Sequence, residues 1–229
     1  MVLVFDLDDT LYDELSYVRS GLSFVAEQVS AEAPVSKRAA FRMLWGQALG
    51  HRSGVFDAVL SELGICTRER VRRYLSAYRL HQPRLKLWPE ARRCLQRFRR
   101  EALYIVTDGN RNVQERKLRA LGLYEHPDIR RCYLTARFGH ARSKPSPYCF
   151  QKIAAREKVG PCQVLYIADN PHKDFVGIKP LGFRTLRVRT GQYRALQMPE
   201  RFEAEATIES LDELTRDLLE SRFSQLQPC

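Results

Sequence analysis

Short apolar segments alternate with helical patterns along this sequence, and that alternation constrains the fold more than any other feature. The predicted strands span residues 2–6, 103–107, 132–135, 164–169 and 184–188. Several of them are almost continuously apolar, which is typical of strands covered on both faces of a parallel sheet. Ser210 and Glu213 form a capping pair for a last helix that is predicted to end near residue 223. Strands alternating with helices predict an α/β fold with a doubly wound, Rossmann-like parallel sheet.

One long helical stretch interrupts the alternation directly after the first strand. The strong helical segments within it span residues 14–31, 37–49, 54–63 and 68–80. A stretch of this length is too long for a loop, so it predicts a separate helical bundle. We therefore expect an α/β core domain of residues 1–12 and 84–229 and a helical cap domain of residues 13–83. The cap would emerge from the carboxyl edge of the sheet, where open α/β folds bind ligands.

The positive net charge of +11 concentrates in one arginine-rich stretch. Residues 68–101 hold twelve basic and three acidic residues. Ala91, Leu95 and Phe98 recur there at helical spacing, so the arginines around them fit a solvated helix face with long side chains. A polyanion-binding surface stays open as the alternative, but no aromatic-rich stacking motif accompanies the charge. Nucleic acid is therefore not an expected partner.

Cysteine spacing and hydropathy set the expected environment. The six cysteines form no C-x-x-C pair, and the histidines show no zinc-ligand spacing, so free thiols in a reducing cytoplasm are predicted. No apolar run reaches the roughly 18 residues that span a bilayer, so no membrane association is expected. Residues 1–5 are predicted to form a buried strand rather than a signal peptide. The sequence gives no prediction of oligomeric state.

Four polar clusters fall at the predicted carboxyl ends of the strands. They are Asp6 with Asp8, Thr107 with Asp108, Lys144, and Asp169 with Asp174. Several carboxylates that converge on a single lysine would repel one another strongly. A hard cation with oxygen ligands would relieve that repulsion, and Mg²⁺ prefers a site of few carboxylates together with water and phosphate.

These clusters carry a family resemblance. The sequence has D-L-D-D-T at residues 6–10, T-D-G-N at 107–110, S-K-P-S-P at 143–147 and A-D-N-P-H-K-D at 168–174. Together and in this order they resemble the haloacid dehalogenase superfamily, in the phosphatase-type subgroup with a helical cap inserted after the first strand. The resemblance covers essentially the whole chain. Ala168 departs from it, since similar proteins often carry glycine before the metal-binding aspartate.

The resemblance implies a role for each cluster. Asp6 would attack phosphorus and form an aspartyl-phosphate, and Asp8 would act as general acid and then as general base. Two residues apart on one strand, both would project to the same side, while Asp9 would point away and take no part. The remaining roles are magnesium binding by Asp6, the Asp8 carbonyl and Asp169, phosphoryl binding by Thr107, the Asp108 N–H and Lys144, and support of Lys144 by Asp174.

The substrate expected from the resemblance is a small phosphomonoester enclosed by the cap. Sugar phosphates, sialic-acid-like phosphates and nucleoside monophosphates are the candidate classes. Tyr17, Arg19 and Arg52 from the cap and Arg111 from the core are candidate substrate contacts. Arg52 lies in a predicted loop, so an ordinary exposed arginine is the alternative at that position.

Three other functions compete with the phosphatase. Carbon–halogen hydrolysis would need neither a general acid nor magnesium, so it would leave Asp8, Asp169 and Asp174 without a role. A phosphomutase would use the same acid and metal and therefore stays open. A catalytically weak protein that binds partners through its basic surface also stays open.

Overall fold

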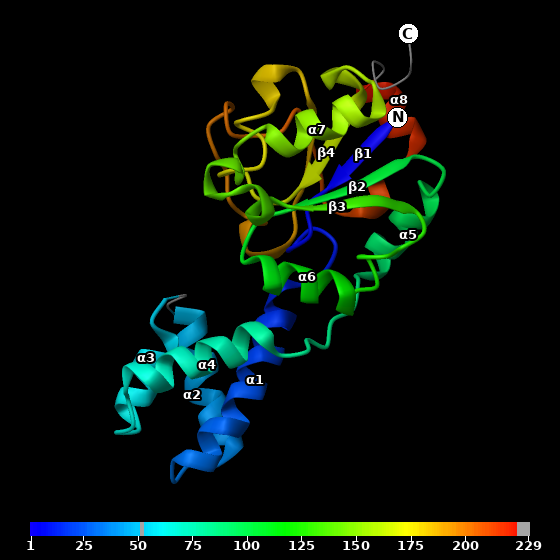
Figure 1. Cartoon of the computed structure of the whole chain (residues 1–229). Helices are drawn as coiled ribbons and strands as arrows, with labels where there is room; N and C mark the ends of the chain where they lie inside the picture. The colour runs from blue at the N-terminus through cyan, green and yellow to red at the C-terminus, as the bar shows by residue number, and fades with distance from the viewer. Residues whose placement is uncertain (51–52, 224–229) are drawn as a thin grey trace. The chain divides into compact units, whose positions relative to one another are not determined.

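The computed structural model describes residues 1–50 and 53–223, and the chain divides into two compact units (Figure 1). One unit comprises Met1–Glu14 and Lys86–Cys229, and the other comprises Leu15–Leu85. The first contains the sheet and its helices, and the second is helical. The function of the helical unit as a cap stays a prediction.

The sheet of the α/β unit has six parallel strands in the order β3-β2-β1-β4-β5-β6. This arrangement confirms the predicted doubly wound α/β fold. The strands are β1 (Val2–Phe5), β2 (Ala102–Thr107), β3 (Ile129–Leu134), β4 (Val164–Ala168), β5 (Arg184–Val188) and β6 (Ala206–Ile208). The sequence did not predict β6, because three residues at a sheet edge are too short to show strand periodicity.

The sheet extends to both sides of the central strand β1. Val2 is paired with Ala102 of β2 on one side and with Val164 of β4 on the other. The connections therefore run outward through β2 and β3 first, and through β4, β5 and β6 afterwards. In a doubly wound sheet this reversal opens a crevice at the carboxyl ends of the central strands, which is where ligands bind. The polar clusters at the ends of β1, β2 and β4 all reach that edge.

The core of the α/β unit lies on both faces of the sheet. On one face, Val4, Tyr104 and Tyr166 pack with Phe150 and Ile153 of α7 (Tyr148–Glu157). Residues of the opposite pleat, such as Leu3, Phe5, Leu103, Ile105, Leu165 and Ile167, are completely buried. Figure 1 shows α7 on one side of the sheet and α5 (Pro89–Arg97) and α6 (Arg111–Ala120) on the other. Full burial of each large apolar side chain contributes about 1.5–3 kcal/mol to the stability of the fold. Packing on both faces of the sheet therefore holds the strand ends firmly in place.

The predicted last helix begins later than the capping pair suggested. Ser210 and Glu213 do form a capping box, but it closes a short 3-10 turn, η6 (Leu211–Glu213). The helix itself, α8 (Arg216–Arg222), begins after Thr215, whose side chain accepts a hydrogen bond from the Leu218 N–H. A capping motif satisfies the first N–H groups of any helical turn, and nothing local requires that turn to continue.

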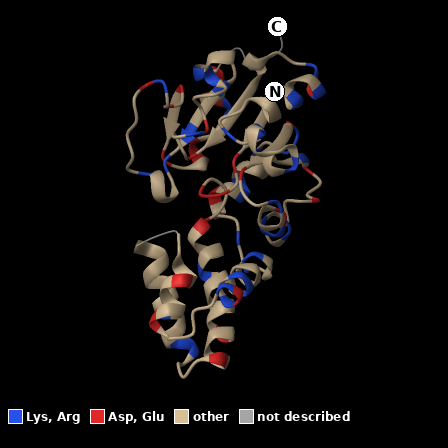
Figure 2. Cartoon of the chain, turned by 60° about the vertical axis from the view of Figure 1, so that its left-hand side comes forward, with Lys and Arg blue, Asp and Glu red and all other residues tan. Residues whose placement is uncertain are grey.

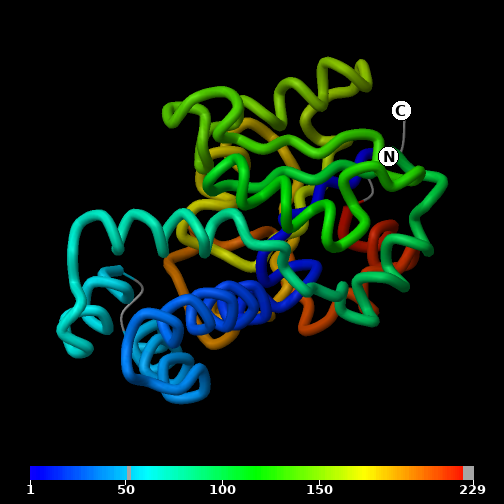
Figure 3. Tube along the Cα trace, turned by 60° about the horizontal axis from the view of Figure 1, so that its bottom comes forward, coloured from blue at the N-terminus to red at the C-terminus, as the bar shows by residue number. Residues whose placement is uncertain are grey.

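The helical unit contains α1 (Glu14–Glu32), α2 (Lys37–Gly50), α3 (Val55–Glu62) and α4 (Arg68–Leu80), as the sequence predicted within one residue at each end (Figure 3). Val25, Val29, Leu44 and Val59 lie at the centre of its apolar core. At Gly21 a β-carbon would lie 2.5 Å from the Tyr78 ring, so only glycine permits this approach of α1 and α4.

Several arginines of the basic stretch have acidic partners. Arg70 and Arg73 of α4 pair with Glu32, and Arg93 of α5 pairs with Asp212. Figure 2 shows acidic residues interspersed with basic ones in both units. Exposed pairs of this kind contribute about 0–1 kcal/mol each, which agrees with a solvated helix face. None of the helices in the described part of the chain is long and apolar enough to cross a membrane.

Candidate active site

Asp6 is held at the end of β1 by the backbone. Its N–H donates to the carbonyl of Ile167 on β4 at 2.9 Å, which extends the pairing one residue beyond Phe5. The strand itself is one residue shorter than predicted, and Asp8 forms an isolated bridge with Tyr12 beyond its end. β1 therefore ends before both aspartates, and the expectation that Asp6 and Asp8 project to the same side stays a prediction.

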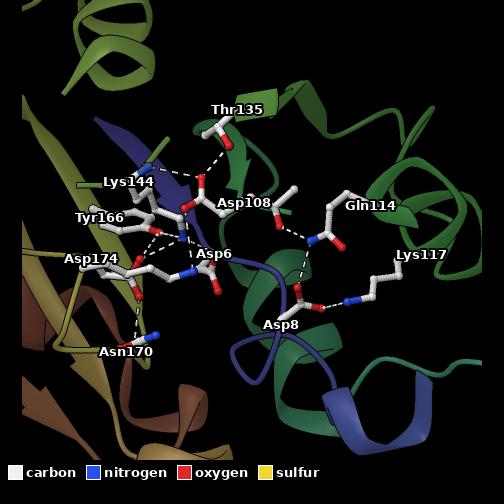
Figure 4. Close-up of polar contacts among 12 residues, drawn as sticks. Asp6, Asp8, Asp108, Gln114, Lys117, Thr135, Lys144, Tyr166, Asn170 and Asp174 are labelled. Carbon is white, nitrogen blue, oxygen red and sulfur yellow. Dashed lines mark hydrogen bonds and ion pairs between the residues drawn. The ribbon is translucent and has the colours of Figure 1, made fainter. Parts of the chain in front are cut away.

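Lys144 lies buried between two aspartates (Figure 4). Its ammonium nitrogen lies 2.5 Å from Asp6 Oδ1, 2.8 Å from Asp174 Oδ1 and 2.8 Å from the Tyr166 hydroxyl. The other oxygen of Asp174 accepts the N–H of Asn170 at 3.1 Å. Among the described residues, protein donors thus contact both oxygens of Asp174 but only Oδ1 of Asp6.

The Lys144 loop packs tightly on the segment after β4. A β-carbon at Gly177 would lie 1.7 Å from the carbonyl oxygen of Pro145. Only glycine therefore fits at this position, and the contact fixes the backbone next to Lys144. This steric restraint, together with the ion pairs of the ammonium, determines where the positive charge lies.

Asp6, Asp169 and Asp174 form a buried carboxylate cluster. One oxygen from each lies within 4.8 Å of the others. Burial, reinforced by the charge of Asp174 and opposed by Lys144, raises the pKa of Asp6 to about 7. Burial and the charges of Asp6 and Asp174 raise the pKa of Asp169 to about 9. Burial lowers the pKa of Lys144, but Asp174 and Asp6 outweigh it, so that pKa is raised and the lysine stays charged.

This cluster suits a hard divalent cation. All of its donor atoms are carboxylate oxygens, which is the set that Mg²⁺ prefers. The raised pKa values of Asp6 and Asp169 show that one lysine does not neutralise three buried carboxylates. A cation would lower the cost of ionising both groups.

Asp8 lies outside this cluster and has partners of its own. Its Oδ1 accepts hydrogen bonds from the Tyr12 hydroxyl at 2.5 Å and the Lys117 ammonium at 2.7 Å. Its Oδ2 accepts one from the Gln114 amide at 2.8 Å. Burial raises the pKa of Asp8, but the charge of Lys117 and these hydrogen bonds outweigh it, so the pKa is lowered overall. The carboxylate is therefore ionised in this arrangement.

Thr107 and Asp108 end β2 beside these groups. Thr107 is buried, and its hydroxyl accepts a hydrogen bond from the Gln114 amide at 2.5 Å. The Asp108 carboxylate accepts the Thr135 hydroxyl and the N–H of Lys144, and it lies 3.7 Å from the Lys173 ammonium. Asp108 thus connects the end of β2 to the turn after β3 and to the Lys144 loop. An open pocket of about 820 Å³, lined partly by His140, lies along this side.

Asp9 stabilises the backbone around the turn after β1. Its φ of 54° is in the left-handed region, which aspartate tolerates better than most residues. Its carboxylate accepts the N–H groups of Glu14 at 2.9 Å and Gln192 at 3.2 Å. A β-carbon at Gly191 would lie 2.2 Å from Asp9 Cγ, so the loop after β5 packs directly on this side chain.

The candidate substrate contacts lie in different surroundings. Tyr17 is buried in the helical unit, and its hydroxyl donates to the Tyr78 carbonyl at 3.3 Å. Arg19 is exposed, stacks over Trp45 and lines a pocket of about 480 Å³ in the helical unit. Arg111 is exposed at the start of α6, and Arg52 lies outside the described residues. A substrate contact for any of the four stays a prediction.

Sequence reasoning missed the partners of Asp8. Gln114 and Lys117 are both almost completely buried although they are polar. Their three-residue spacing on α6, which begins just after the Thr107 cluster, places both on one helix face. A signal for these partners was present in the sequence. Polar residues occupy core-facing positions of a short helix that lies beside a polar cluster.

Comparisons with known proteins identify the family of the chain. A family model for haloacid dehalogenase-like hydrolases matches residues 1–182. Phosphoserine phosphatase of Thermus thermophilus is 29% identical, over 83% of this chain and 89% of its own length. Glyceraldehyde 3-phosphate phosphatase of Pyrococcus furiosus is also 29% identical, over 93% and 90%.

The fold has a solved counterpart as well. A magnesium-bound HAD-hydrolase of Bacillus subtilis, YfnB, superposes with a TM-score of 0.67 at 21% identity, over 93% of this chain and 96% of that one. The family match covers most of the chain and includes all four polar clusters. The chain therefore belongs to the haloacid dehalogenase-like hydrolases, as its motifs predicted.

Proposed function

We propose that this protein is a magnesium-dependent phosphatase that hydrolyses a small phosphomonoester through an aspartyl-phosphate on Asp6. The observation that carries the proposal is the contact of Lys144 with both Asp6 and Asp174 beside the Asp169 carboxylate. This arrangement holds a carboxylate nucleophile next to a positive charge at the ligand-binding edge of the sheet. The names of the two relatives, both phosphatases of small metabolites, support the same reaction.

Asp6, Asp169 and the backbone carbonyl of Asp8 would hold the magnesium ion. Asp174 would hold Lys144 instead, because protein donors occupy both of its oxygens. When bound, magnesium would reduce the repulsion between the carboxylate nucleophile and the phosphate dianion.

In the first half-reaction, an oxygen of Asp6 attacks phosphorus in line with the leaving group. The bond from phosphorus to the ester oxygen breaks, and a mixed anhydride forms on Asp6. Asp8, which must first take up a proton from solvent, gives that proton to the departing alkoxide, which leaves as the alcohol. Thr107, the Asp108 N–H and Lys144 hold the phosphoryl oxygens while charge moves onto the leaving group.

In the second half-reaction, water attacks the phosphorus of the aspartyl-phosphate. Asp8, now ionised, accepts a proton from that water, and the bond between phosphorus and Asp6 breaks. Inorganic phosphate leaves, and Asp6 returns as a carboxylate. The lowered pKa of Asp8 suits this step, because a base must be ionised before it can accept the proton.

The helical unit would act as the cap. A cap excludes water and supplies the groups that recognise the leaving group, which favours small esters over phosphoproteins. Arg19 and Arg111 are exposed cations that suit a second acidic group on the substrate. The buried free thiols of Cys94, Cys132 and Cys149 fit a reducing cytoplasm.

The test is phosphate release from p-nitrophenyl phosphate and from a panel of small metabolite phosphates, with magnesium and with excess EDTA. We expect turnover that requires magnesium and that Asp6→Asn abolishes. Asp57→Asn, at an exposed position on α3, is the matched control and should retain full activity. Full activity of Asp6→Asn would refute the covalent mechanism. Phosphoryl transfer between sugar positions without release of phosphate would instead indicate a phosphomutase.

A further inference from the structure

We propose that Gln114 and Lys117 of α6 are positioning residues that hold Asp8 in place for proton transfer. The inference rests on the proposed phosphatase function, in which Asp8 is the general acid and base. Neither residue contacts the reacting phosphorus in this assignment; both would act through Asp8.

Side-chain donors contact the whole carboxylate of Asp8. Tyr12 and Lys117 both donate to Asp8 Oδ1, and Gln114 donates to Oδ2. Both carboxylate oxygens therefore have a donor, and the donors approach from two different segments of the chain. A carboxylate bonded at both oxygens has one preferred orientation, whereas a singly bonded one rotates about its side-chain torsions.

Burial fixes the two donors from α6 in place. Gln114 is 2% exposed and Lys117 is 3% exposed, so neither can move aside without disturbing the core. The amide of Gln114 also lies 2.5 Å from the Thr107 hydroxyl. One side chain thus connects the proposed acid and base to a proposed phosphoryl-binding group. Such coupling keeps the distance between the proton donor and the phosphoryl site constant.

Burial of the charged Lys117 side chain carries a cost in free energy. The Lys117 ammonium lies 2.7 Å from Asp8 and 3.7 Å from Glu14. A buried ion pair is weak evidence for stability, because apolar residues of similar volume often replace such a pair without loss. Stability alone therefore does not explain this lysine. Its position against Asp8 does.

The leaving group of the ester distinguishes a positioning residue from one that only stabilises the fold. A residue that positions the general acid affects esters whose alkoxide needs a proton, and it affects aryl esters with good leaving groups much less. A residue that only stabilises the fold affects both kinds of ester equally. A comparison of rates on phosphoserine and on p-nitrophenyl phosphate therefore separates the two roles. If phosphoserine is not turned over, another alkyl phosphate that the enzyme hydrolyses takes its place.

The variants are Lys117→Met and Gln114→Met, which keep side-chain length and remove the donor. We expect kcat on the alkyl ester to fall about 10- to 100-fold, with kcat on p-nitrophenyl phosphate falling less than about threefold and KM changing little. Lys117→Arg should recover part of the loss, because it restores a cation. Arg119→Met, on the exposed face of the same helix, is the control and should match the wild type.

Equal losses on both esters, or no loss on either, would overturn the proposal while leaving the phosphatase assignment intact. Absence of magnesium-dependent turnover in the wild type would count against the phosphatase instead. Crystal structures of the wild type and Gln114→Met give a readout that does not need turnover. Asp8 should keep its orientation in the wild type and rotate in the variant, which removes the donor to Oδ2, and an unmoved Asp8 carboxylate in Gln114→Met would also refute the positioning role.

Discussion

Asp6→Asn should make the metal-free protein more stable while it abolishes turnover. Asparagine keeps the shape of Asp6 and removes one of three crowded carboxylates. The pKa of Asp6 is about 7 in the folded chain, compared with an ordinary value of 3.8, a difference of about three. Each pKa unit corresponds to 1.36 kcal/mol, so the ionised Asp6 costs up to about 4 kcal/mol above pH 7. Asparagine also weakens the contact with Lys144, so we expect a net gain of about 2–4 kcal/mol.

The pH dependence follows from the direction of the shift. Below about pH 4, Asp6 is protonated in both the folded and the unfolded chain, so the variant should show little gain there. As pH rises toward 7, the unfolded chain releases the proton and the folded chain retains it, so the wild type loses stability. The gain from Asp6→Asn should therefore grow between pH 4 and pH 7 and then level off.

The assay is thermal unfolding in EDTA at pH 4 and pH 8. A gain of 2–4 kcal/mol corresponds to roughly 5–15 °C at pH 8 for a chain of this size. Asp57→Asn serves as the control, because that carboxylate is exposed. A variant that is less stable than the wild type at pH 8, or a gain of equal size at both pH values, would refute the reasoning that crowded burial destabilises Asp6.

Three further predictions concern the metal, the Lys144 loop and the helical unit. Magnesium should raise the melting temperature more at pH 8 than at pH 5.5, because it competes with protons for carboxylates of raised pKa; equal shifts would contradict this site. Gly177→Ala should cost about 1–3 kcal/mol in thermal unfolding and lower kcat, because its β-carbon overlaps Pro145. Gly46→Ala, which meets no atom within 4 Å, is its control and should not destabilise the protein. Arg19→Ala should change relative kcat/KM among metabolite phosphates more than the rate on p-nitrophenyl phosphate, and uniform losses across the panel would argue against a role in specificity.

The elements of the fold were largely predictable because their signals are local. Apolar runs located β1, β2, β4 and β5 within one residue, and helical periodicity located α1 to α4 equally well. Where prediction failed, the signal was short or ambiguous. β6 has three residues, and the capping box at Ser210 closes a single turn before α8 begins.

The sequence by itself determined which chemical groups reach the carboxyl edge of the sheet. Parallel strands end at one edge, so Asp6, Thr107 and Asp169 had to converge once their strands were identified. Their order in the chain also identified the family. Both conclusions depend only on residue types and their positions along the chain.

Only the tertiary structure decided which of these groups contact one another. Lys144 contacts Asp6 across 138 positions of the chain, and Lys117 contacts Asp8 across 109. Contacts at such separations depend on the packing of whole helices and loops, which local propensity does not encode. Two aspartates of one motif, separated by a single residue, thereby received opposite environments: burial among carboxylates raises the pKa of Asp6, and three donors lower that of Asp8.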